Sequence, residues 1–194
     1  MTALELAQQL RNRFGGLLGE PLEFRGEVSL ELSDPDCIAE VGRVARDELG
    51  FDLLLDITSV DNFDQPPRWL IVYHLYSLRH RQFLRLKTRV SEEKSELPTV
   101  TTVWPAADWH EREIYDMMGV RFRGHPDLRR ILMWEGYPYH PLRKDFPLGG
   151  LPSDVPGVAF TEPAPLEGGP FVTLPGAPDA IAREPRARPV QKES

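Results

Sequence analysis

The stretch WLIVYHLYSLRHRQFLRLKTRV, residues 69–90, decides the fold class of this chain of 194 residues. Its first part, from Trp69 to Leu78, is apolar on both faces, which predicts a strand at a central position in the sheet. Its second part, from Phe83 to Val90, alternates apolar and basic side chains, which indicates a strand with one face in water. The short connection 79–82 predicts that the two strands form an antiparallel hairpin.

Further β segments are predicted on either side of this hairpin. Residues 27–32 alternate with a period of two, and residues 99–103 are rich in β-branched side chains, so both are predicted as strands. Residues 51–60 are predicted as another strand, with four apolar residues on one face: Phe51, Leu53, Leu55 and Ile57. Together with the hairpin they form a mostly antiparallel sheet.

Three helices are predicted around the sheet. Thr2 and Glu5 form a capping box in front of a helix that ends near the glycines at 15–16. Asp34 followed by a proline starts a second helix that runs to about residue 49. A third helix spans 109–118. Helices before and after a mostly antiparallel sheet predict an α+β domain over residues 1–147, with the helices packed on one face.

The composition changes after this domain. More than half of the 19 prolines fall from Pro147 onward, together with several glycines, and no helix or strand period is present there. Apolar residues are nevertheless spaced along the segment: Val155, Val158, Phe160, Leu166, Phe171, Val172 and Leu174. We predict that 148–194 is an extended C-terminal arm that becomes ordered against a partner; a plain disordered tail is the alternative.

Composition excludes several classes of function. A formal net charge of −7 argues against nucleic acid as the partner. The single cysteine, Cys37, excludes an intrachain disulfide and a four-cysteine iron–sulfur or zinc site built by this chain alone. The apolar runs are shorter than the roughly 20 residues that span a bilayer, and no basic leader precedes an apolar stretch, so a cytoplasmic location is expected.

No residue pattern predicts catalysis, cofactor binding or a metal site. Phosphate-binding glycine loops, nucleophile elbows and paired metal-ligand histidines are all missing from the sequence. The nearest approach to a metal cluster combines Glu113, Asp116 and His125, which would suit a free-standing metal-dependent hydrolase. A charge network is the favoured alternative, since Arg112 lies four residues before Asp116 on a helix and is placed to pair with it.

One motif is far more specific. Residues 104–147 read WPAADWHEREIYDMMGVRFRGHPDLRRILMWEGYPYHPLRKDFP. This stretch resembles the family of the 30 kDa subunit of respiratory complex I. The signature or interface residues that the resemblance implies are Glu111, Arg112, Glu113, Asp116, Gly119, Gly124, His125, Pro126, Asp127, Arg129, Arg130, His140, Pro141, Arg143, Lys144 and Asp145.

The resemblance implies a structural role. Members are cofactor-free subunits of the hydrophilic arm of NADH–quinone oxidoreductase, which transfers electrons from NADH to quinone and couples this to proton translocation. FMN and iron–sulfur clusters are expected in partner subunits, and the 49 kDa protein and neighbouring iron–sulfur subunits are the expected partners. The location implied is the cytoplasmic side of the inner membrane, held there through the complex. A related membrane-bound hydrogenase or quinone-reducing complex is the alternative assembly.

The motif also predicts a surface for docking. On the third helix, Ile114, Met117 and Met118 form an apolar stripe expected to face the sheet, with the charged residues largely elsewhere. The loop after it is rich in the residue types that anchor protein interfaces. These are Arg129, Arg130, Trp134, Tyr137, Tyr139, Arg143 and Phe146.

Overall fold

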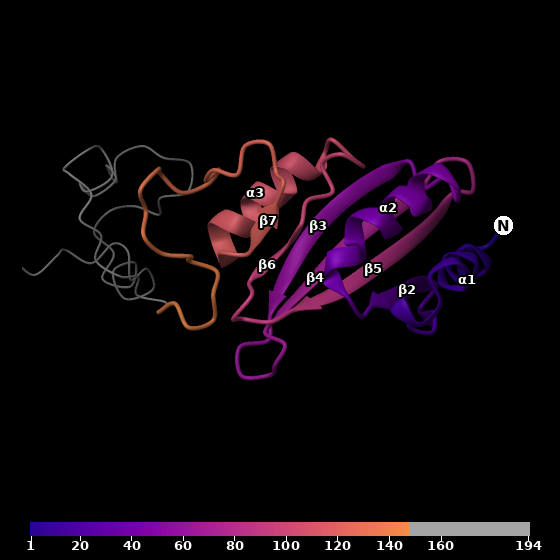
Figure 1. The fold of residues 1–194 in the computed structure, drawn as a ribbon, viewed down its shortest axis with the longest axis horizontal. Helices are drawn as coiled ribbons and strands as arrows, with labels where there is room; N and C mark the ends of the chain where they lie inside the picture. The colour runs from indigo at the N-terminus through magenta and orange to yellow at the C-terminus, as the bar shows by residue number, and fades with distance from the viewer. Residues whose placement is uncertain (148–194) are drawn as a thin grey trace, which may run out of the picture. The chain divides into compact units, whose positions relative to one another are not determined.

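A computed structural model describes residues 1–147, so the predicted arm at 148–194 lies outside the described residues. The elements (Figure 1) are α1 (Ala3–Phe14), η1 (Gly15–Leu17), β1 (Leu22–Phe24), β2 (Glu27–Leu32), η2 (Pro35–Cys37), α2 (Ile38–Asp47), β3 (Leu53–Asp61), β4 (Trp69–Ser77), β5 (Gln82–Val90), β6 (Glu96–Pro98), α3 (Ala107–Met118) and β7 (Arg121–Arg123).

The main sheet has five strands in the order β1-β2-β5-β4-β3, and β6 pairs with β7 in a separate two-stranded sheet. Every neighbouring pair in the main sheet is antiparallel except β2 and β5, which are parallel. The predicted hairpin is confirmed, with Ser77 opposite Gln82 at its closed end. The α+β class with a mostly antiparallel sheet is therefore confirmed.

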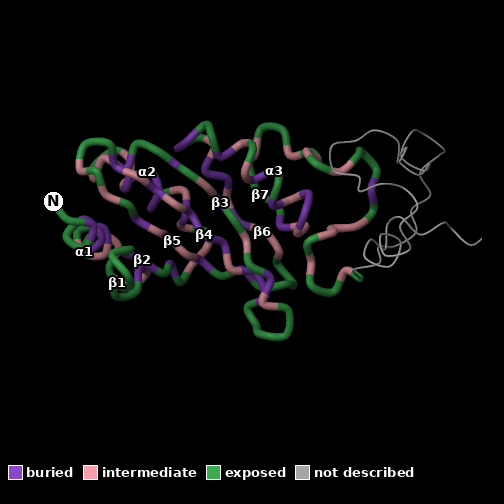
Figure 2. The backbone as a smooth tube through the Cα atoms, turned by 180° about the vertical axis from the view of Figure 1, so that it is seen from behind, coloured by how far each residue is buried: buried purple, intermediate pink, exposed green. Residues whose placement is uncertain are grey.

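The core lies on one face of this sheet. Leu84, Leu86 and Val90 of β5 are each about 1% exposed, whereas the basic residues between them point to the opposite face. Helix α2 crosses the apolar face (Figure 1), and Figure 2 shows the buried backbone positions gathered in the strands and on the helices. The opposite face carries ion pairs such as Arg85 with Glu27, as expected of a solvated surface.

Helix boundaries follow the local sequence. The Thr2 hydroxyl accepts from the Glu5 N–H at 3.2 Å, and the Glu5 carboxylate accepts from the Thr2 N–H at 2.9 Å. Asp34 accepts from the Asp36 N–H at the start of η2, which leads into α2. None of the helices within residues 1–147 has the length and apolar character needed to cross a bilayer.

The predicted face of β3 is wrong in its first half. Leu53 and Leu55 are 40% and 45% exposed, whereas Leu54 is buried. A β-bulge between Leu54 and Asp56 inserts one residue into the strand. The insertion changes the alternation, so that Leu54 and Ile57 both face the core although they are three residues apart.

The strand predicted at 99–103 is also wrong. The segment forms turns, and the strand lies just before it, at β6. The Val103 and Trp104 N–H groups both donate to the Val100 carbonyl at 2.9 Å, which closes a turn. The Val100 N–H donates to the side chain of Glu111 instead of a neighbouring strand. β-branched composition alone does not reveal this competition for backbone donors.

Candidate functional site

The motif residues meet where the loop 129–146 folds back over the C-terminal end of α3. The last carbonyl groups of a helix have no partner inside the helix, so other groups must satisfy them. The Tyr115 carbonyl accepts from the Gly119 N–H at 2.9 Å, which ends the helix. The Met117 carbonyl accepts from the Leu142 N–H at 3.1 Å, which brings the far part of the loop onto the helix.

Cationic and imidazole side chains cover the other two carbonyls. Arg143 donates from Nε to the Met118 carbonyl at 2.6 Å. The Asp116 carbonyl accepts from the Arg130 guanidinium at 3.2 Å and from Nδ1 of His140 at 2.9 Å. Positive groups at this position interact favourably with the negative end of the helix dipole. These contacts give three of the signature residues a shared physical role.

The Asp116 carboxylate holds the start of the same loop. Its Oδ2 accepts from three successive N–H groups, those of Ile131, Leu132 and Met133, at 3.0, 2.7 and 2.8 Å. Its Oδ1 accepts from Arg130 at 2.5 Å. Burial alone raises the pKa of Asp116, but these hydrogen bonds outweigh it and hold the pKa below its ordinary value. Asp116 is therefore a buried carboxylate that fixes a loop.

The predicted pair of Arg112 with Asp116 does not form. Arg112 instead donates to the Arg129 and Arg130 carbonyls at 3.2 and 3.1 Å, and its guanidinium lies over the Trp109 ring. Arg112 and Asp116 are both buried, as expected of a buried charge network, although the two side chains bind different partners. Glu113 is exposed and makes no hydrogen bond or ion pair with any residue between 1 and 147.

Gly119 is required by the close approach of this loop. Its backbone angle φ is +79°, which residues other than glycine rarely adopt. A Cβ atom at this position would lie 2.6 Å from Nε2 of His140 and closer still to Nη2 of Arg143. The glycine thus serves both the helix end and the seating of two signature side chains.

The far end of the loop is fixed to the sheet by a charge cluster that sequence reasoning missed. Arg68 binds the Asp61 carboxylate through two nitrogens, each at 2.9 Å, and both side chains are buried. Arg68 also contacts Asp145 at 3.0 Å and Glu92 at 2.5 Å. The Lys144 N–H donates to Asp61 at 2.8 Å. The signature residues Lys144 and Asp145 therefore attach the loop to the ends of β3 and β4.

The Trp69 ring completes this attachment, because it lies beside two guanidinium groups. The Arg68 guanidinium lies 4.5 Å from the Trp69 ring centroid, and that of Arg143 lies 5.3 Å from the same ring. Burial raises the pKa of Asp61, but the hydrogen bonds from Arg68 and two backbone N–H groups prevail and lower it to about 2. The only sequence signal for this cluster is an acid and a base at the facing ends of two neighbouring strands.

A second group of signature residues surrounds the start of α3. Glu111 is fully buried and accepts from the Val100 N–H at 2.7 Å and the Thr99 hydroxyl at 2.5 Å. His125 accepts from the Asp127 N–H at Nδ1, so its Nε2 carries the proton and donates to the Asp108 carbonyl at 3.2 Å. Gly124 and Pro126 flank this imidazole and are exposed, as is Asp127.

Burial raises the pKa of Glu111 to about 7, against an ordinary value of 4.5, despite the two hydrogen bonds that favour its charged form. The folded chain therefore keeps a proton that the unfolded chain releases between pH 4.5 and 7, so the free energy of unfolding falls as pH rises through this window. A rise of this size corresponds to about 3 kcal/mol, at about 1.4 kcal/mol for each pH unit.

We expect Glu111→Gln to remove this pH dependence, because the uncharged amide can still accept from the Val100 N–H through its oxygen, while its NH2 group can donate to the Thr99 hydroxyl oxygen, which reverses that bond. The variant should match the native chain near pH 4.5 and exceed its free energy of unfolding by up to about 3 kcal/mol at about pH 8. Urea denaturation at several pH values measures the difference. Glu113→Gln is the control, since Glu113 is exposed and unpaired among residues 1–147. A parallel pH response in native and Glu111→Gln chains would contradict the expectation.

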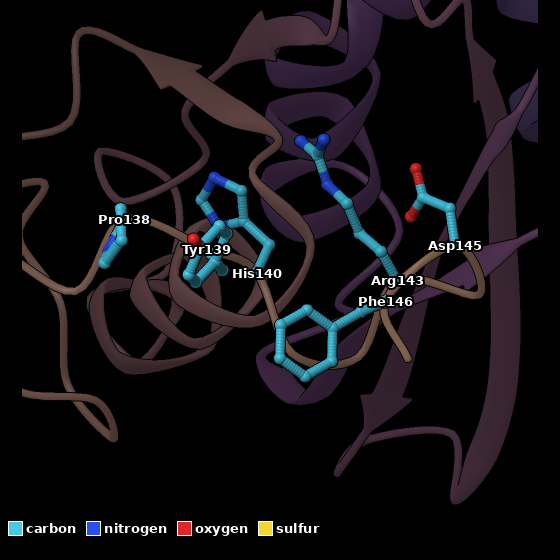
Figure 3. Close-up of a pocket in the computed structure, with 6 residues that line it drawn as sticks. All are labelled: Pro138, Tyr139, His140, Arg143, Asp145 and Phe146. Carbon is cyan, nitrogen blue, oxygen red and sulfur yellow. The ribbon is translucent and has the colours of Figure 1, made fainter. Parts of the chain in front are cut away.

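The loop carries a continuous row of aromatic rings between its two anchored ends, of which Tyr137 is buried and the others are partly or more fully exposed. Successive centroids are 4.5, 5.6 and 6.0 Å apart along the series Trp134, Tyr137, Tyr139 and Phe146. Leu132 and Leu142 lie in the same loop and are 62% and 57% exposed. A cavity of about 200 Å³ opens at the end of the row (Figure 3). Such a surface is typical of a protein interface.

The structure does not assemble the metal site considered as an alternative. Asp116 is occupied by three N–H groups and Arg130, and His125 by the Asp127 N–H and the Asp108 carbonyl. Glu113 is exposed to solvent. Among residues 1–147, no three His, Cys, Asp or Glu side chains are placed to hold a metal ion.

Comparison with known proteins identifies the family. The model of the "Respiratory-chain NADH dehydrogenase, 30 Kd subunit" family matches residues 32–151. The C subunit of the NADH-quinone oxidoreductase of Geotalea uraniireducens (strain Rf4) is 44% identical over 142 residues, which cover 73% of this chain and 86% of that protein. The corresponding protein of Rhizobium etli (strain CIAT 652), numbered 2 in that organism, is 42% identical over 188 residues, or 95% of this chain and 94% of that one.

Solved structures give the same result. The trypsin-resistant fragment (1–134) of Nqo5 is 30% identical, with a TM-score of 0.56, over 66% of this chain and 100% of that chain. A chain of the membrane-bound sulfane sulfur reductase, an archaeal respiratory membrane complex, is 28% identical, with a TM-score of 0.66, over 74% and 85%. Fold, motif and relatives agree: the chain belongs to the family of the 30 kDa subunit of respiratory-chain NADH dehydrogenase.

Proposed function

We propose that this chain is a structural subunit of NADH–quinone oxidoreductase that carries no redox group and fixes its neighbours in place. One observation carries the proposal. The loop 129–146 has neither helix nor strand, yet it is held at one end by Asp116 and at the other by Asp61 and Arg68. An irregular segment held this firmly while displaying apolar side chains is suited to docking rather than to motion.

The partners proposed are the 49 kDa protein and the neighbouring iron–sulfur subunits. In this arrangement FMN and iron–sulfur clusters belong to the partners, and the chain is peripheral on the cytoplasmic side of the inner membrane. The family and the names of the relatives support this placement. The contribution of this chain to electron transfer from NADH to quinone is geometric, because neighbours held rigidly keep the distances between clusters and quinone constant.

The arm at 148–194 is proposed to add a second contact with a partner. The match to the Rhizobium etli relative spans 95% of the chain and so includes most of this segment, although the family model ends at residue 151. An extended arm with spaced apolar residues gains its order from the surface that it covers. Domain 1–147 and the arm are thus proposed to be two adhesive parts of one subunit.

The double variant Leu132→Ser, Leu142→Ser tests the loop. Both side chains are more than half exposed, so the free energy of unfolding should barely change, whereas the association should weaken about ten-fold or more through the loss of two apolar contacts. The measurement is recovery of the 49 kDa protein, and of NADH-dependent quinone reduction, with a tagged chain purified from native membranes.

The matched control is Leu22→Ser, Leu78→Ser, which removes two leucines that are 62% and 58% exposed on other parts of the domain. This variant should retain the partners. Equal recovery with both double variants would argue against the loop as the docking surface. Equal loss with both would point to a general requirement for exposed leucines rather than to this loop.

A second candidate is the corresponding subunit of a related respiratory membrane complex. The likeness to a chain of the archaeal sulfane sulfur reductase favours it. The higher identity of the NADH-quinone oxidoreductase relatives, 42% and 44% against 28%, favours the first candidate. Recovery of flavin and iron–sulfur subunits in the same purification would support the NADH-linked complex. Recovery of hydrogenase-type subunits would instead assign the chain to the related complex, with the same scaffold role.

A further inference from the structure

The cavity at the end of the aromatic row has a distinct chemical lining. It measures about 200 Å³ and is lined by Pro138, Tyr139, His140, Arg143, Asp145 and Phe146. Figure 3 shows His140 and Arg143 extending from the loop in the same direction, while the Phe146 ring forms another side. Two aromatic rings, the Arg143 guanidinium, the His140 imidazole and the Asp145 carboxylate, which binds Arg68, therefore line one small open space.

Arg143 is the unusual member of this lining. It is only partly exposed and uses Nε to bind the Met118 carbonyl. Its two terminal nitrogens make no hydrogen bond with residues 1–147, and no carboxylate of those residues lies within ion-pair distance of it. A guanidinium carries five N–H donors in a planar fork, so the donors of the two terminal nitrogens remain open to a further acceptor.

The nearby acids are committed elsewhere. Asp61, Glu92 and Asp145 all bind Arg68. Burial lowers the pKa of Arg143, the neighbouring charge of Arg68 lowers it further, and the attraction of the three acids does not restore it. Arg143 is thus a partly buried cation whose loss of hydration the neighbouring acids do not fully offset, and its terminal N–H donors are left for a further acceptor.

We propose that this cavity is a socket for a carboxylate side chain, Asp or Glu, on a partner subunit of the complex. The inference rests on the proposed function and names the chemistry of one of its contacts. The planar fork of Arg143 suits a bidentate carboxylate, and the volume accommodates one acidic side chain. The rings of Tyr139 and Phe146 cover the methylene part of that side chain and exclude water, which strengthens the ion pair.

The socket adjoins the rest of the docking surface. Tyr139 is a member of both the aromatic row and the cavity lining. A partner segment that lies along the row therefore reaches the cavity without a change of direction. An apolar contact region with one charge-specific anchor at its end also supplies register, because a wrong alignment leaves the acid buried without its partner.

The test places the photo-reactive residue p-benzoylphenylalanine at Phe146, in the whole complex purified from native membranes. Irradiation followed by mass spectrometry identifies the segment that occupies the socket. The expected product links position 146 to another subunit, close in sequence to an Asp or Glu. Exchange of charges then follows: Arg143→Glu lowers recovery of that subunit about ten-fold or more, and Arg in place of the partner's acid restores it.

Three outcomes overturn the socket. They are a cross-link to a partner segment without Asp or Glu, a cross-link only to residues 148–194 of the same chain, and no cross-link to protein. Because Arg143 also binds the end of α3, Arg143→Glu is compared with native for its free energy of unfolding, and the cross-link does not depend on it. The leucine variants test docking separately, so a failed socket is distinguishable from a failed docking surface.

Discussion

Asp116→Ala is expected to lower the free energy of unfolding of the chain by about 3 to 5 kcal/mol. The carboxylate is fully buried and accepts from three successive N–H groups and from Arg130. Its removal leaves a guanidinium without its counter-charge and the loop without its first anchor. The expected loss of stability is smaller than the summed contributions of the four hydrogen bonds, because the released N–H groups of the loop can bind water instead.

Urea denaturation followed by circular dichroism measures this loss, and trypsin reports where it acts. Cleavage after Arg129 and Arg130 should become faster in the variant, since the N–H groups that follow are no longer held. Asp127→Ala is the control: Asp127 lies in the same motif but forms an exposed pair with Arg129, worth less than about 1 kcal/mol. Similar losses in both variants would contradict the anchoring role of Asp116.

Much of the fold is predictable because its signals are local. The alternation from Leu84 to Val90 reports directly which face of β5 is buried, and the residues of the Thr2–Glu5 capping box act within one helical turn. The bulge in β3 is different, since one inserted residue reverses the faces without changing the apolar character of the segment. Alternation counted back from Ile57 therefore places Leu55 on the wrong face.

The site is only partly predictable because most of its contacts join residues that are far apart in the sequence. Resemblance identifies residues such as Asp116 and His140, but helical periodicity alone does not show that Glu111 and Arg112 are buried. These charges are buried because their partners come from distant segments. Lys144 donates to Asp61 across 83 positions of the sequence, a separation at which no local pattern operates.

Arg68→Met should lower the free energy of unfolding by about 3 to 5 kcal/mol at about pH 7, as Asp116→Ala does. The reason is that, among residues 1–147, Arg68 is the only cationic side chain that binds the buried Asp61 carboxylate. Without Arg68 the pKa of Asp61 rises from about 2 toward or above its ordinary value. The stability that the native chain gains from the lowered pKa of Asp61 is fully present above the ordinary pKa of 3.8 and is lost as pH falls through about 2. The difference in free energy of unfolding between native chain and variant should therefore narrow in acid.

Denaturation at about pH 7 and about pH 3 measures both parts of this prediction. Glu92→Gln is the matched control, since Glu92 binds the same guanidinium but is 61% exposed, and its loss should cost less than about 1 kcal/mol. Methionine fills a comparable volume beside Trp69, so the effect reports charge more than packing. A constant difference at both pH values would mean that packing against Trp69, and not the Asp61 ion pair, is what Arg68 contributes, and the loop's second anchor would then be apolar.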